Sequence, residues 1–248
     1  MLLRQRADSG MEAIVLAGGF GTRLSERLQG VPKPMALVAG RPFLEILLTR
    51  LQRAGCDHVV LSVGYLHQVI QDHFGASFLG MRVDYAIESA PLGTGGAIRL
   101  ALNQIREESV LVLNGDTFLQ ADYADMMRFH AAEGAAATIA VVHQPNIARY
   151  GGVVVEGNRI VGFEEKSRFD DGQNSGPNPG LISAGAYVLA RNLAWPPNLG
   201  KRFSIERDFF APEIGRLRPA AYMVEGFFLD IGLPEDLDRA QTDLAQFT

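Results

Sequence analysis

Apolar residues along this chain gather in short runs that alternate with longer amphipathic segments. EAIVLA at 12–17 and DHVVLSV at 57–63 have the length and apolar content of strands buried on both faces. Between them, PFLEILLTRLQRAG at 42–55 repeats apolar residues on one helical face, with Pro42 suited to its first position and Gly55 to its end. The pattern therefore predicts a strand, a helix and a second strand in succession.

The same alternation continues to about residue 143. Further strands are predicted at 82–87, 110–114 and 137–143, and helices at 65–74, 95–108 and 123–134. Strands separated by helices of this length predict an α/β fold, Rossmann-like, with a mostly parallel, doubly wound sheet and helices on both faces.

The pattern changes near residue 150. Two strand-like pieces flank Gly157-Asn158 within 151–165, which predicts a small β-hairpin insertion. The breaker-rich stretch 167–180 is a candidate mobile loop. Short strands at 183–189, 220–225 and 227–232 and a closing helix at 234–247, begun by Pro234, complete the pattern. We predict one domain over 11–248, preceded by a disordered extension at 1–10.

Composition narrows the possible functions. With 248 residues, 47% of them hydrophobic, the chain can bury a full core. Its net charge of −5 and pI near 5.6 argue against nucleic-acid binding. No segment approaches a membrane span, and the single Cys56 forms no disulfide framework, so we expect a cytoplasmic protein with a buried, inert thiol.

The first predicted strand runs into LAGGFGTRL at 16–24. No GKS or GKT follows, so this is not a Walker A loop. Gly19 and Gly21 match part of a dinucleotide-binding fingerprint, but Leu24 stands at the third glycine position, which makes a hydride-transfer enzyme unlikely. Two readings remain: a turn that donates backbone N–H groups to phosphates with Arg23 as a clamp, or an ordinary surface turn.

Arg23, Glu88, Asp116 and Asp230 fall at or just beyond the carboxyl ends of predicted strands, where ligands bind in open α/β sheets. Lys33, held between Pro32 and Pro34, suits contact with a phosphate, or is a solvated lysine. Asp116 and Asp230 each follow a buried strand and together match a Mg²⁺ site, although each could instead cap a turn or helix. Five scattered histidines and one cysteine show no zinc-ligand spacing.

LAGGFGTRL, VPKPM, ESAPLGTGGA, LNGDT, FEEKS, SAGAY and FLDIGLPED occur in one order over residues 13–240. In this set the chain resembles the bacterial sugar-1-phosphate nucleotidylyltransferases. PLGTGGAI, NGDTF, RYG and FEEK are similar to the subgroup of D-glycero-α-D-manno-heptose 1-phosphate guanylyltransferases. The resemblance implies a nucleotide-diphospho-sugar transferase fold, with a nucleotide half at about 11–120 and a sugar-phosphate half at about 121–248.

The resemblance also implies a set of site residues. The catalytic residues would be Arg23, Lys33, Asp116 and Lys166, with Mg²⁺ held by Asp116 and Asp230. The triphosphate and nucleotide would be bound by Leu16, Ala17, Gly18, Gly19, Gly21, Thr22, Arg23, Glu88, Pro91, Gly93 and Thr94. The sugar phosphate would be bound by Asn114, Gly151, Glu165, Lys166 and Gly185. For Lys166 the alternative is an exposed lysine beside two glutamates.

In the implied reaction, a sugar 1-phosphate attacks the α-phosphorus of a nucleoside triphosphate and pyrophosphate leaves. The attacking phosphate is already an anion, so the task is to neutralise and align two polyanions without a general base. Glu88 stands where relatives place the base-reading side chain. A carboxylate can accept both the N1–H and the exocyclic amine of guanine, which favours GTP over UTP or dTTP.

Three alternatives stay open from the sequence. The enzyme could be a mannose-1-phosphate guanylyltransferase or a short sugar-phosphate uridylyltransferase. A nucleotide-binding regulatory subunit is a non-enzyme alternative, although such a chain is expected to lose Arg23, Lys33 or a metal-binding aspartate. A homodimer is possible, and the implied product would be a precursor of lipopolysaccharide, capsule or S-layer glycans.

Overall fold

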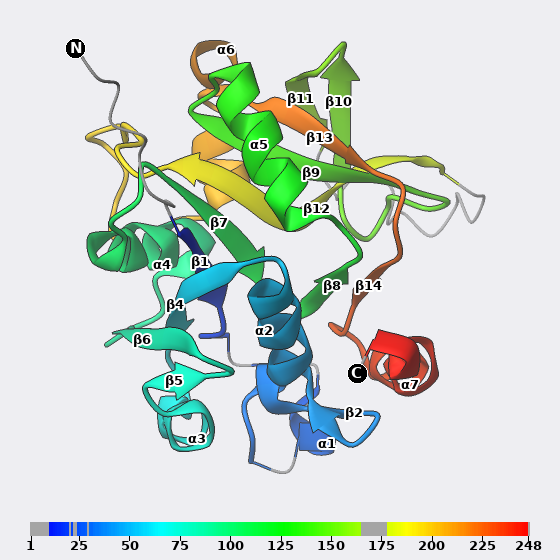
Figure 1. Cartoon of the computed structure of the whole chain (residues 1–248). Coiled ribbons are helices and arrows are strands. Elements are labelled where there is room, and N and C mark those ends of the chain that lie inside the picture. The colour runs from blue at the N-terminus through cyan, green and yellow to red at the C-terminus, as the bar shows by residue number, and fades with distance from the viewer. Residues whose placement is uncertain (1–9, 20, 22–23, 29, 165–177, 248) are drawn as a thin grey trace.

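The structure is a computed structural model that describes residues 10–19, 21, 24–28, 30–164 and 178–247. Its centre is a ten-stranded mixed sheet with the order β10-β11-β13-β9-β12-β7-β1-β4-β6-β5 (Figure 1). The strands are β1 (Met11–Leu16), β4 (Cys56–Val63), β5 (Ser77–Phe78), β6 (Met81–Ile87), β7 (Ser109–Asn114), β9 (Ala137–Gln144), β10 (Gly152–Glu156), β11 (Arg159–Glu164), β12 (Gly180–Ala190) and β13 (Ala220–Val224).

The strands β7, β1, β4 and β6 form a parallel unit, because β1 pairs in parallel with β4 and β7, and β4 with β6. Their carboxyl ends therefore meet at one edge of the sheet. The pair β9 and β13 is also parallel, and β12 lies antiparallel between β7 and β9. The α/β, Rossmann-like prediction is confirmed, while the position of β12 between two earlier strands was not predictable from the local pattern.

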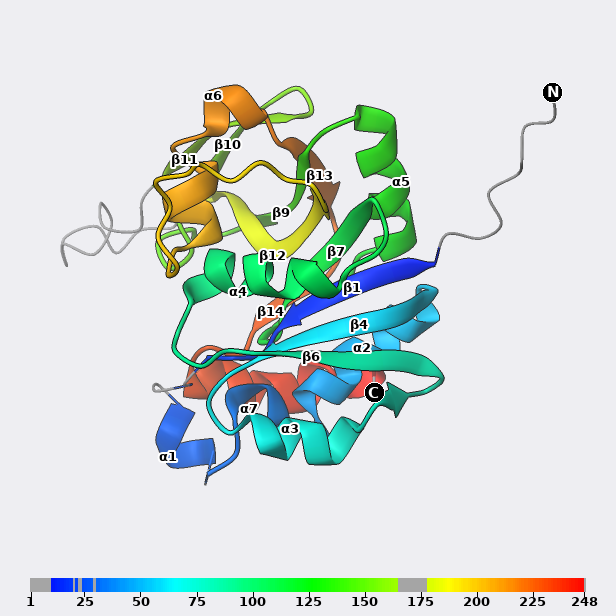
Figure 2. The same cartoon turned by 90° about the vertical axis from the view of Figure 1, so that its left-hand side faces the viewer.

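Helices cover both faces of the sheet, as Figures 1 and 2 show. One face carries α2, α3 and α5 over a core that includes Val15, and the other carries α4 and a π-helical turn over a core that includes Ile14. This alternation within β1 is the period-two pattern of a strand buried on both faces. The helices are α1 (Ser25–Leu28), α2 (Phe43–Arg53), α3 (His67–Phe74), α4 (Gly93–Ala101), α5 (Tyr123–Glu133), α6 (Ile214–Leu217) and α7 (Pro234–Asp243), with helical turns η2 (Lys33–Met35), η3 (Leu102–Gln104), η5 (Ile205–Phe210) and η6 (Ala245–Phe247).

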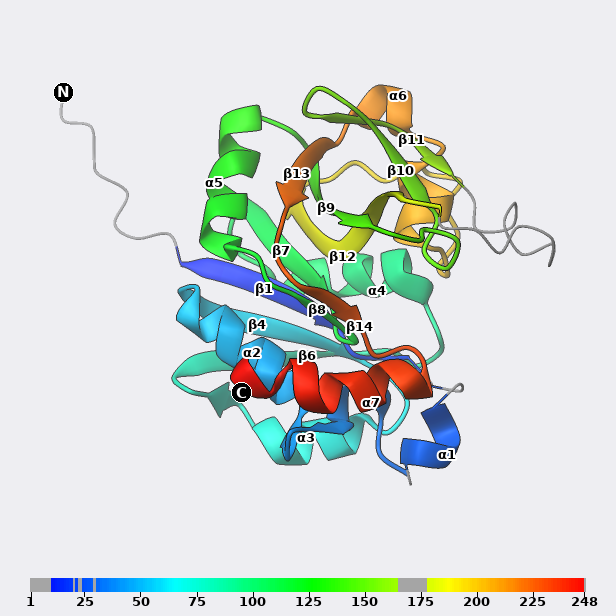
Figure 3. The same cartoon turned by 90° about the vertical axis from the view of Figure 1, so that its right-hand side faces the viewer.

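Two small sheets complete the fold. β8 (Thr117–Leu119) pairs antiparallel with β14 (Phe228–Asp230), and β2 (Leu37–Val38) pairs with β3 (Arg41–Pro42). α7 follows β14 along the lower part of the molecule (Figure 3) and packs on a third apolar cluster with α1, α2 and β14. Within the described ranges, no helix is long and apolar enough to cross a membrane.

Several predicted boundaries shift for local reasons. Pro42 lies in β3 and caps α2, which begins at Phe43. The helix predicted at 65–74 begins at His67, because Leu66 has a left-handed backbone with φ of 56°. The helix predicted at 95–108 extends from Gly93 and ends as a 3₁₀ turn at Gln104, because the amides of residues 106 and 107 donate to the Glu12 carboxylate.

The hairpin around Gly157-Asn158 is confirmed as β10 and β11. The strand predicted at 183–189 is longer and spans Gly180–Ala190. The closing helix begins at Pro234 as predicted, but its α-helical part ends at Asp243. The sequence pattern missed β8 and η5. Most of the predicted loop 167–180 lies outside the described residues.

Candidate active site

The turns that follow β1, β4 and β7 are joined by backbone hydrogen bonds. The Ala17 N–H donates to the Ser62 carbonyl at 2.7 Å, and the Gly115 N–H donates to the Leu16 carbonyl at 2.9 Å. The predicted nucleotide-binding residues Leu16 and Ala17 therefore lie between the end of β4 and the Gly115-Asp116 turn. This arrangement aims the glycine-rich segment at the same sheet edge as Asp116.

Glu88 lies beside the glycine-rich segment. A Cβ atom on Gly18 would stand 2.5 Å from Glu88 Oε1, so only glycine allows this approach without a shift. Glu88 Oε2 accepts a hydrogen bond from the Leu92 N–H at 2.9 Å, and Ser62 Oγ donates to Oε1 at 3.3 Å. The carboxylate predicted to read the base thus also orders the loop that follows it.

The segment Pro91–Gly95, which leads into α4, is bound to a segment far along the chain. The Gly95 N–H donates to the Phe203 carbonyl at 3.0 Å, and the Phe203 N–H donates to the Leu92 carbonyl at 2.9 Å. Thr94 Oγ1 accepts from the Ile205 N–H at 2.9 Å. Pro91, Gly93 and Thr94 nevertheless keep exposed surface at this edge. The partner segment at 203–205 was not predicted from the sequence, because its only local signal is an isolated pair of apolar residues.

Lys33 and the two predicted metal ligands lie together. Lys33 Nζ lies 2.7 Å from Asp116 Oδ2. Asp230 pairs with Thr117 across β14 and β8, and the Ile231 N–H donates to the Asp116 carbonyl at 2.9 Å. A Cβ atom on Gly21 would lie 3.0 Å from Lys33 Cβ, so the glycine-rich segment packs against this group.

Asp230 is largely buried and lies near a second carboxylate. Burial and the neighbouring Asp116 carboxylate raise the pKa of Asp230, while Lys33, Arg149 and the Gly232 N–H act in the opposite direction. Two carboxylates held this close are stabilised by a shared cation, and oxygen ligands are those that Mg²⁺ prefers. Asp116 and Asp230 are therefore of the chemical type that could hold a divalent metal ion.

No group of three or more His, Cys, Asp and Glu side chains is placed to hold a metal ion in the part of the chain that the structure describes. Cys56 is buried, and burial raises the pKa of its thiol to about 12, which is not the state of a nucleophile. His58 is enclosed by Glu12 and Asp84, with ring nitrogens 2.6 Å and 3.0 Å from their carboxylates. These groups lie at the opposite ends of β1, β4 and β6 from the site.

Asn114 and Gly185, two of the predicted sugar-phosphate residues, lie next to each other in the described part of the chain. Asn114 ends β7, and its buried Oδ1 has no hydrogen-bond partner among the described residues. Gly185 has φ of +66°, and a Cβ atom there would lie 2.5 Å from Asn114 Nδ2. Asn178 Nδ2 is also buried without a partner in the described ranges and was not foreseen from sequence. Buried polar atoms of this kind are usually satisfied by a partner, and a bound ligand can supply one.

Arg149 is a further residue that the sequence analysis did not assign to the site. Arg149 Nη2 lies 3.8 Å from Asp230 Oδ1, and Nη1 forms an ion pair with Asp236. Its only sequence signal was the RYG motif at 149–151, in which the predicted sugar-binding residue was Gly151. Gly151 is buried in the adjoining turn, where its N–H donates to the Ile147 carbonyl at 2.9 Å.

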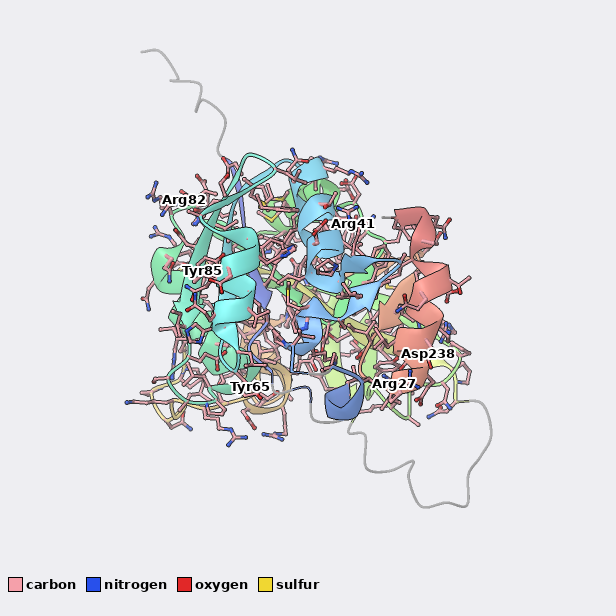
Figure 4. All side chains as sticks on the ribbon, turned by 90° about the horizontal axis from the view of Figure 1, so that it is seen from below. Arg27, Arg41, Tyr65, Arg82, Tyr85 and Asp238 are labelled. Carbon is pink, nitrogen blue, oxygen red and sulfur yellow. The ribbon has the colours of Figure 1, made fainter. Side chains whose placement is uncertain are left out.

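An ion pair joins α1, which follows the glycine-rich segment, to α7. Arg27 Nη1 lies 3.0 Å from Asp238 Oδ1, and both residues lie on the same edge of the molecule in Figure 4.

Four predicted site residues lie outside the described residues, so their roles stay predictions: Thr22, Arg23, Glu165 and Lys166. Gly19 is within the described ranges, and no described atom beyond its chain neighbours lies within 4 Å of where its Cβ atom would be.

Comparison with known proteins agrees with this site. The model of the family described as Nucleotidyl transferase matches residues 12–246. The D-glycero-α-D-manno-heptose 1-phosphate guanylyltransferase of Aneurinibacillus thermoaerophilus is 35% identical over 96% of this chain and 100% of its own. The enzyme of the same name from Campylobacter jejuni is 37% identical over 91% of this chain and 96% of its own.

A solved structure leads to the same family. The crystal structure of HddC from Yersinia pseudotuberculosis complexed with GMP-PN is 31% identical, with a TM-score of 0.77 over 93% of this chain and 98% of that chain. Enzymes of this kind generally use a divalent metal ion, for which Asp116 and Asp230 are suited. From its site, its fold and these relatives, the chain belongs to the nucleotidyl transferase family and is an enzyme of the sugar-1-phosphate guanylyltransferase type.

Proposed function

We propose that this enzyme transfers GMP from GTP to D-glycero-α-D-manno-heptose 1-phosphate, with Mg²⁺ as cofactor, and releases pyrophosphate. The observation that carries the proposal is the convergence of Lys33, Asp116 and Asp230 beside the glycine-rich segment. The choice of sugar is supported by two relatives of this specificity that match over nearly their whole length.

The proposed chemistry follows from the charges in the site. Asp116 and Asp230 would hold Mg²⁺, which supplies positive charge to the phosphates when it is bound. Lys33 and, by the sequence prediction, Arg23 would add positive charge beside the triphosphate. A charge that is already held in place stabilises the reacting phosphates more than one that must first be brought into position. The sugar phosphate is the nucleophile and needs no side chain to remove a proton. The protein's contribution is to neutralise the two anions and align them.

Glu88 supports the choice of guanine. Its carboxylate lies at the end of β6 beside Gly18, and both of its oxygens already accept hydrogen bonds from groups of the loop and of β4. Each carboxylate oxygen has more than one acceptor site, so this geometry leaves capacity for N1–H and the exocyclic amine of guanine.

A cytoplasmic location and a homodimer are also parts of the proposal. Cell fractionation would test the location, and analytical ultracentrifugation would test the oligomeric state.

The deciding experiment measures pyrophosphate release with Mg²⁺, each of four nucleoside triphosphates, and the 1-phosphates of the heptose, mannose and glucose. We expect turnover with GTP and the heptose 1-phosphate to exceed every other pair. Preference for mannose 1-phosphate would replace the sugar but keep the reaction. Preference for UTP or dTTP would contradict the role of Glu88, and binding of GTP without release from any pair would favour a regulatory subunit.

A further inference from the structure

Arg149 lies between two carboxylates that belong to different parts of the site. One is Asp230, at the end of β14, and the other is Asp236, in the first turn of α7. We propose that Arg149 is a positioning residue for the metal site, which holds the Asp230 carboxylate in the orientation that binds the cation. Asp236, in turn, holds Arg149. The inference rests on the metal role given to Asp230 in the proposed function.

The contacts of the Asp230 carboxylate fall on one of its two oxygens. Oδ1 accepts a hydrogen bond from the Gly232 N–H at 2.5 Å and is the oxygen nearest to Arg149 Nη2, at 3.8 Å. Among the described residues, no donor bonds to Oδ2. The carboxylate is therefore held through one oxygen, and the other is available to a cation as a single ligand.

Arg149 is itself held on more than one side. Asp236 is 6% exposed, so the carboxylate that pairs with Arg149 is largely removed from solvent, while the arginine side chain stays partly exposed. The guanidinium carbon lies 5.2 Å from the centre of the Tyr150 ring, and that ring contacts Phe228 edge-to-face at 5.5 Å. Because Phe228 belongs to β14, the strand that carries Asp230, the arginine and the carboxylate are fixed to one packed unit.

The guanidinium group is suited to this task. It is planar and carries separate donors, so Nη1 contacts Asp236 while Nη2 lies toward Asp230. A lysine would supply one point charge on a flexible stem and could not hold both carboxylates in a fixed relation. Groups that orient metal ligands in this way typically contribute about 10- to 100-fold to metal affinity or activity.

The test compares Arg149→Gln and Arg149→Lys with a matched control, Arg239→Gln. Arg239 also contacts Asp236, at 3.8 Å, but is more exposed and forms no ion pair with Asp230 within the described ranges. Mn²⁺ binding is measured by electron paramagnetic resonance of the free ion, with a non-hydrolysable GTP analogue present. We expect Arg149→Gln to weaken Mn²⁺ binding about 10- to 100-fold, Arg149→Lys to weaken it less, and Arg239→Gln to leave it unchanged.

The Mg²⁺ dependence of activity is a second readout, and a general loss of structure would not produce the pattern that we expect. The Mg²⁺ concentration for half-maximal activity should rise about tenfold or more in Arg149→Gln, while saturating Mg²⁺ restores most of kcat and the KM for the sugar 1-phosphate stays near the wild-type value. Asp236→Asn should show the same split in weaker form. Circular dichroism and thermal unfolding identify any variant that does not fold.

Unchanged Mn²⁺ binding in a folded Arg149→Gln protein would overturn the inference. A rise confined to the KM for the sugar 1-phosphate would also overturn it, because Arg149 would then contact substrate. The binding readout does not depend on which sugar or base is used. If the wild-type protein accepts a different substrate pair but its Mn²⁺ affinity still depends on Arg149, the proposed function fails and this inference stands.

Discussion

Lys33 Nζ lies 2.7 Å from Asp116 Oδ2, although the two residues are 83 positions apart in the sequence. The lysine side chain is mostly buried, and the aspartate is more exposed. Pro32 and Pro34 stiffen the backbone around Lys33, and the contact with Asp116 holds its charged end at the carboxyl end of β7.

We therefore expect Lys33→Gln to lower kcat/KM with GTP by about 100-fold, the cost of losing one preorganised charge at a phosphate site. Steady-state pyrophosphate release is the measurement. Arg128→Gln serves as the control, because it removes a cation from the exposed face of α5. Activity of Lys33→Gln within threefold of wild type would contradict a phosphate role for this lysine.

Glu88 gives a prediction about the base. Glu88→Gln keeps a carbonyl oxygen that can still accept from the Leu92 N–H, so the loop should remain in place. The new amide donor opposes the guanine N–H groups, and we expect kcat/KM for GTP to fall by about 10- to 100-fold, while the value for UTP stays level or rises.

The control for Glu88 is Glu156→Gln, which alters an exposed carboxylate at the end of β10. The ratio of kcat/KM values for GTP and UTP, measured with one sugar 1-phosphate, decides the outcome. An unaltered ratio would mean that backbone groups of the 91–94 loop read the base.

Comparing Gly185→Ala with Gly157→Ala distinguishes a steric effect at the predicted sugar pocket from the effect of backbone strain. Gly185 and Gly157 have similar left-handed backbones, with φ of +66° and +60°. A Cβ atom at Gly185 would lie 2.5 Å from Asn114 Nδ2, whereas one at Gly157 meets no described atom within 4 Å apart from its chain neighbours. Both alanine variants should lose about 1 kcal/mol of stability from strain.

Only Gly185→Ala should, in addition, raise the KM for the sugar 1-phosphate, because it displaces the Asn114 amide. We expect a rise of about tenfold, equivalent to about 1.4 kcal/mol. Urea unfolding and sugar-phosphate titration of both variants provide the comparison. Equal KM values for the sugar 1-phosphate in the two proteins would contradict the prediction that Asn114 and Gly185 line the sugar pocket.

Glu12 predicts how stability depends on pH. Burial raises the pKa of Glu12, but hydrogen bonds from the Glu107 and Arg106 amides and from His58 outweigh it, so the net shift is below the ordinary value of 4.5. A lowered folded-state pKa means that the ionised group stabilises the folded state above about pH 4.5 and that this contribution is lost as the pH falls further.

We expect the free energy of unfolding of the wild type to drop between pH 5 and pH 3, and that of Glu12→Gln to start lower and fall less over this range. Urea unfolding at several pH values measures both. Glu225→Gln, which alters an exposed carboxylate, should follow the wild-type curve. Parallel curves for wild type and Glu12→Gln would show that other groups control acid unfolding.

The sequence by itself determined the elements and much of the chemistry. Strands such as 57–63 and the hairpin at Gly157-Asn158 were found within a residue or two, because buried strands and tight turns have a local signature in residue type and spacing. The motif order was enough to identify the family. Where local prediction failed, as beyond Gln104, a distant carboxylate, Glu12, had taken the backbone N–H groups.

Only the tertiary structure decided which distant residues meet. The sequence could place Asp116 and Asp230 at strand ends, but the β8–β14 pairing brings them together. In the sequence, Arg149 was only the first residue of the RYG motif, and only the fold shows that it lies between Asp230 and Asp236. The local sequence pattern predicts the conformation of a single segment. These contacts depend instead on pairing and packing between segments dozens of residues apart, and a short stretch of sequence carries no information about that pairing.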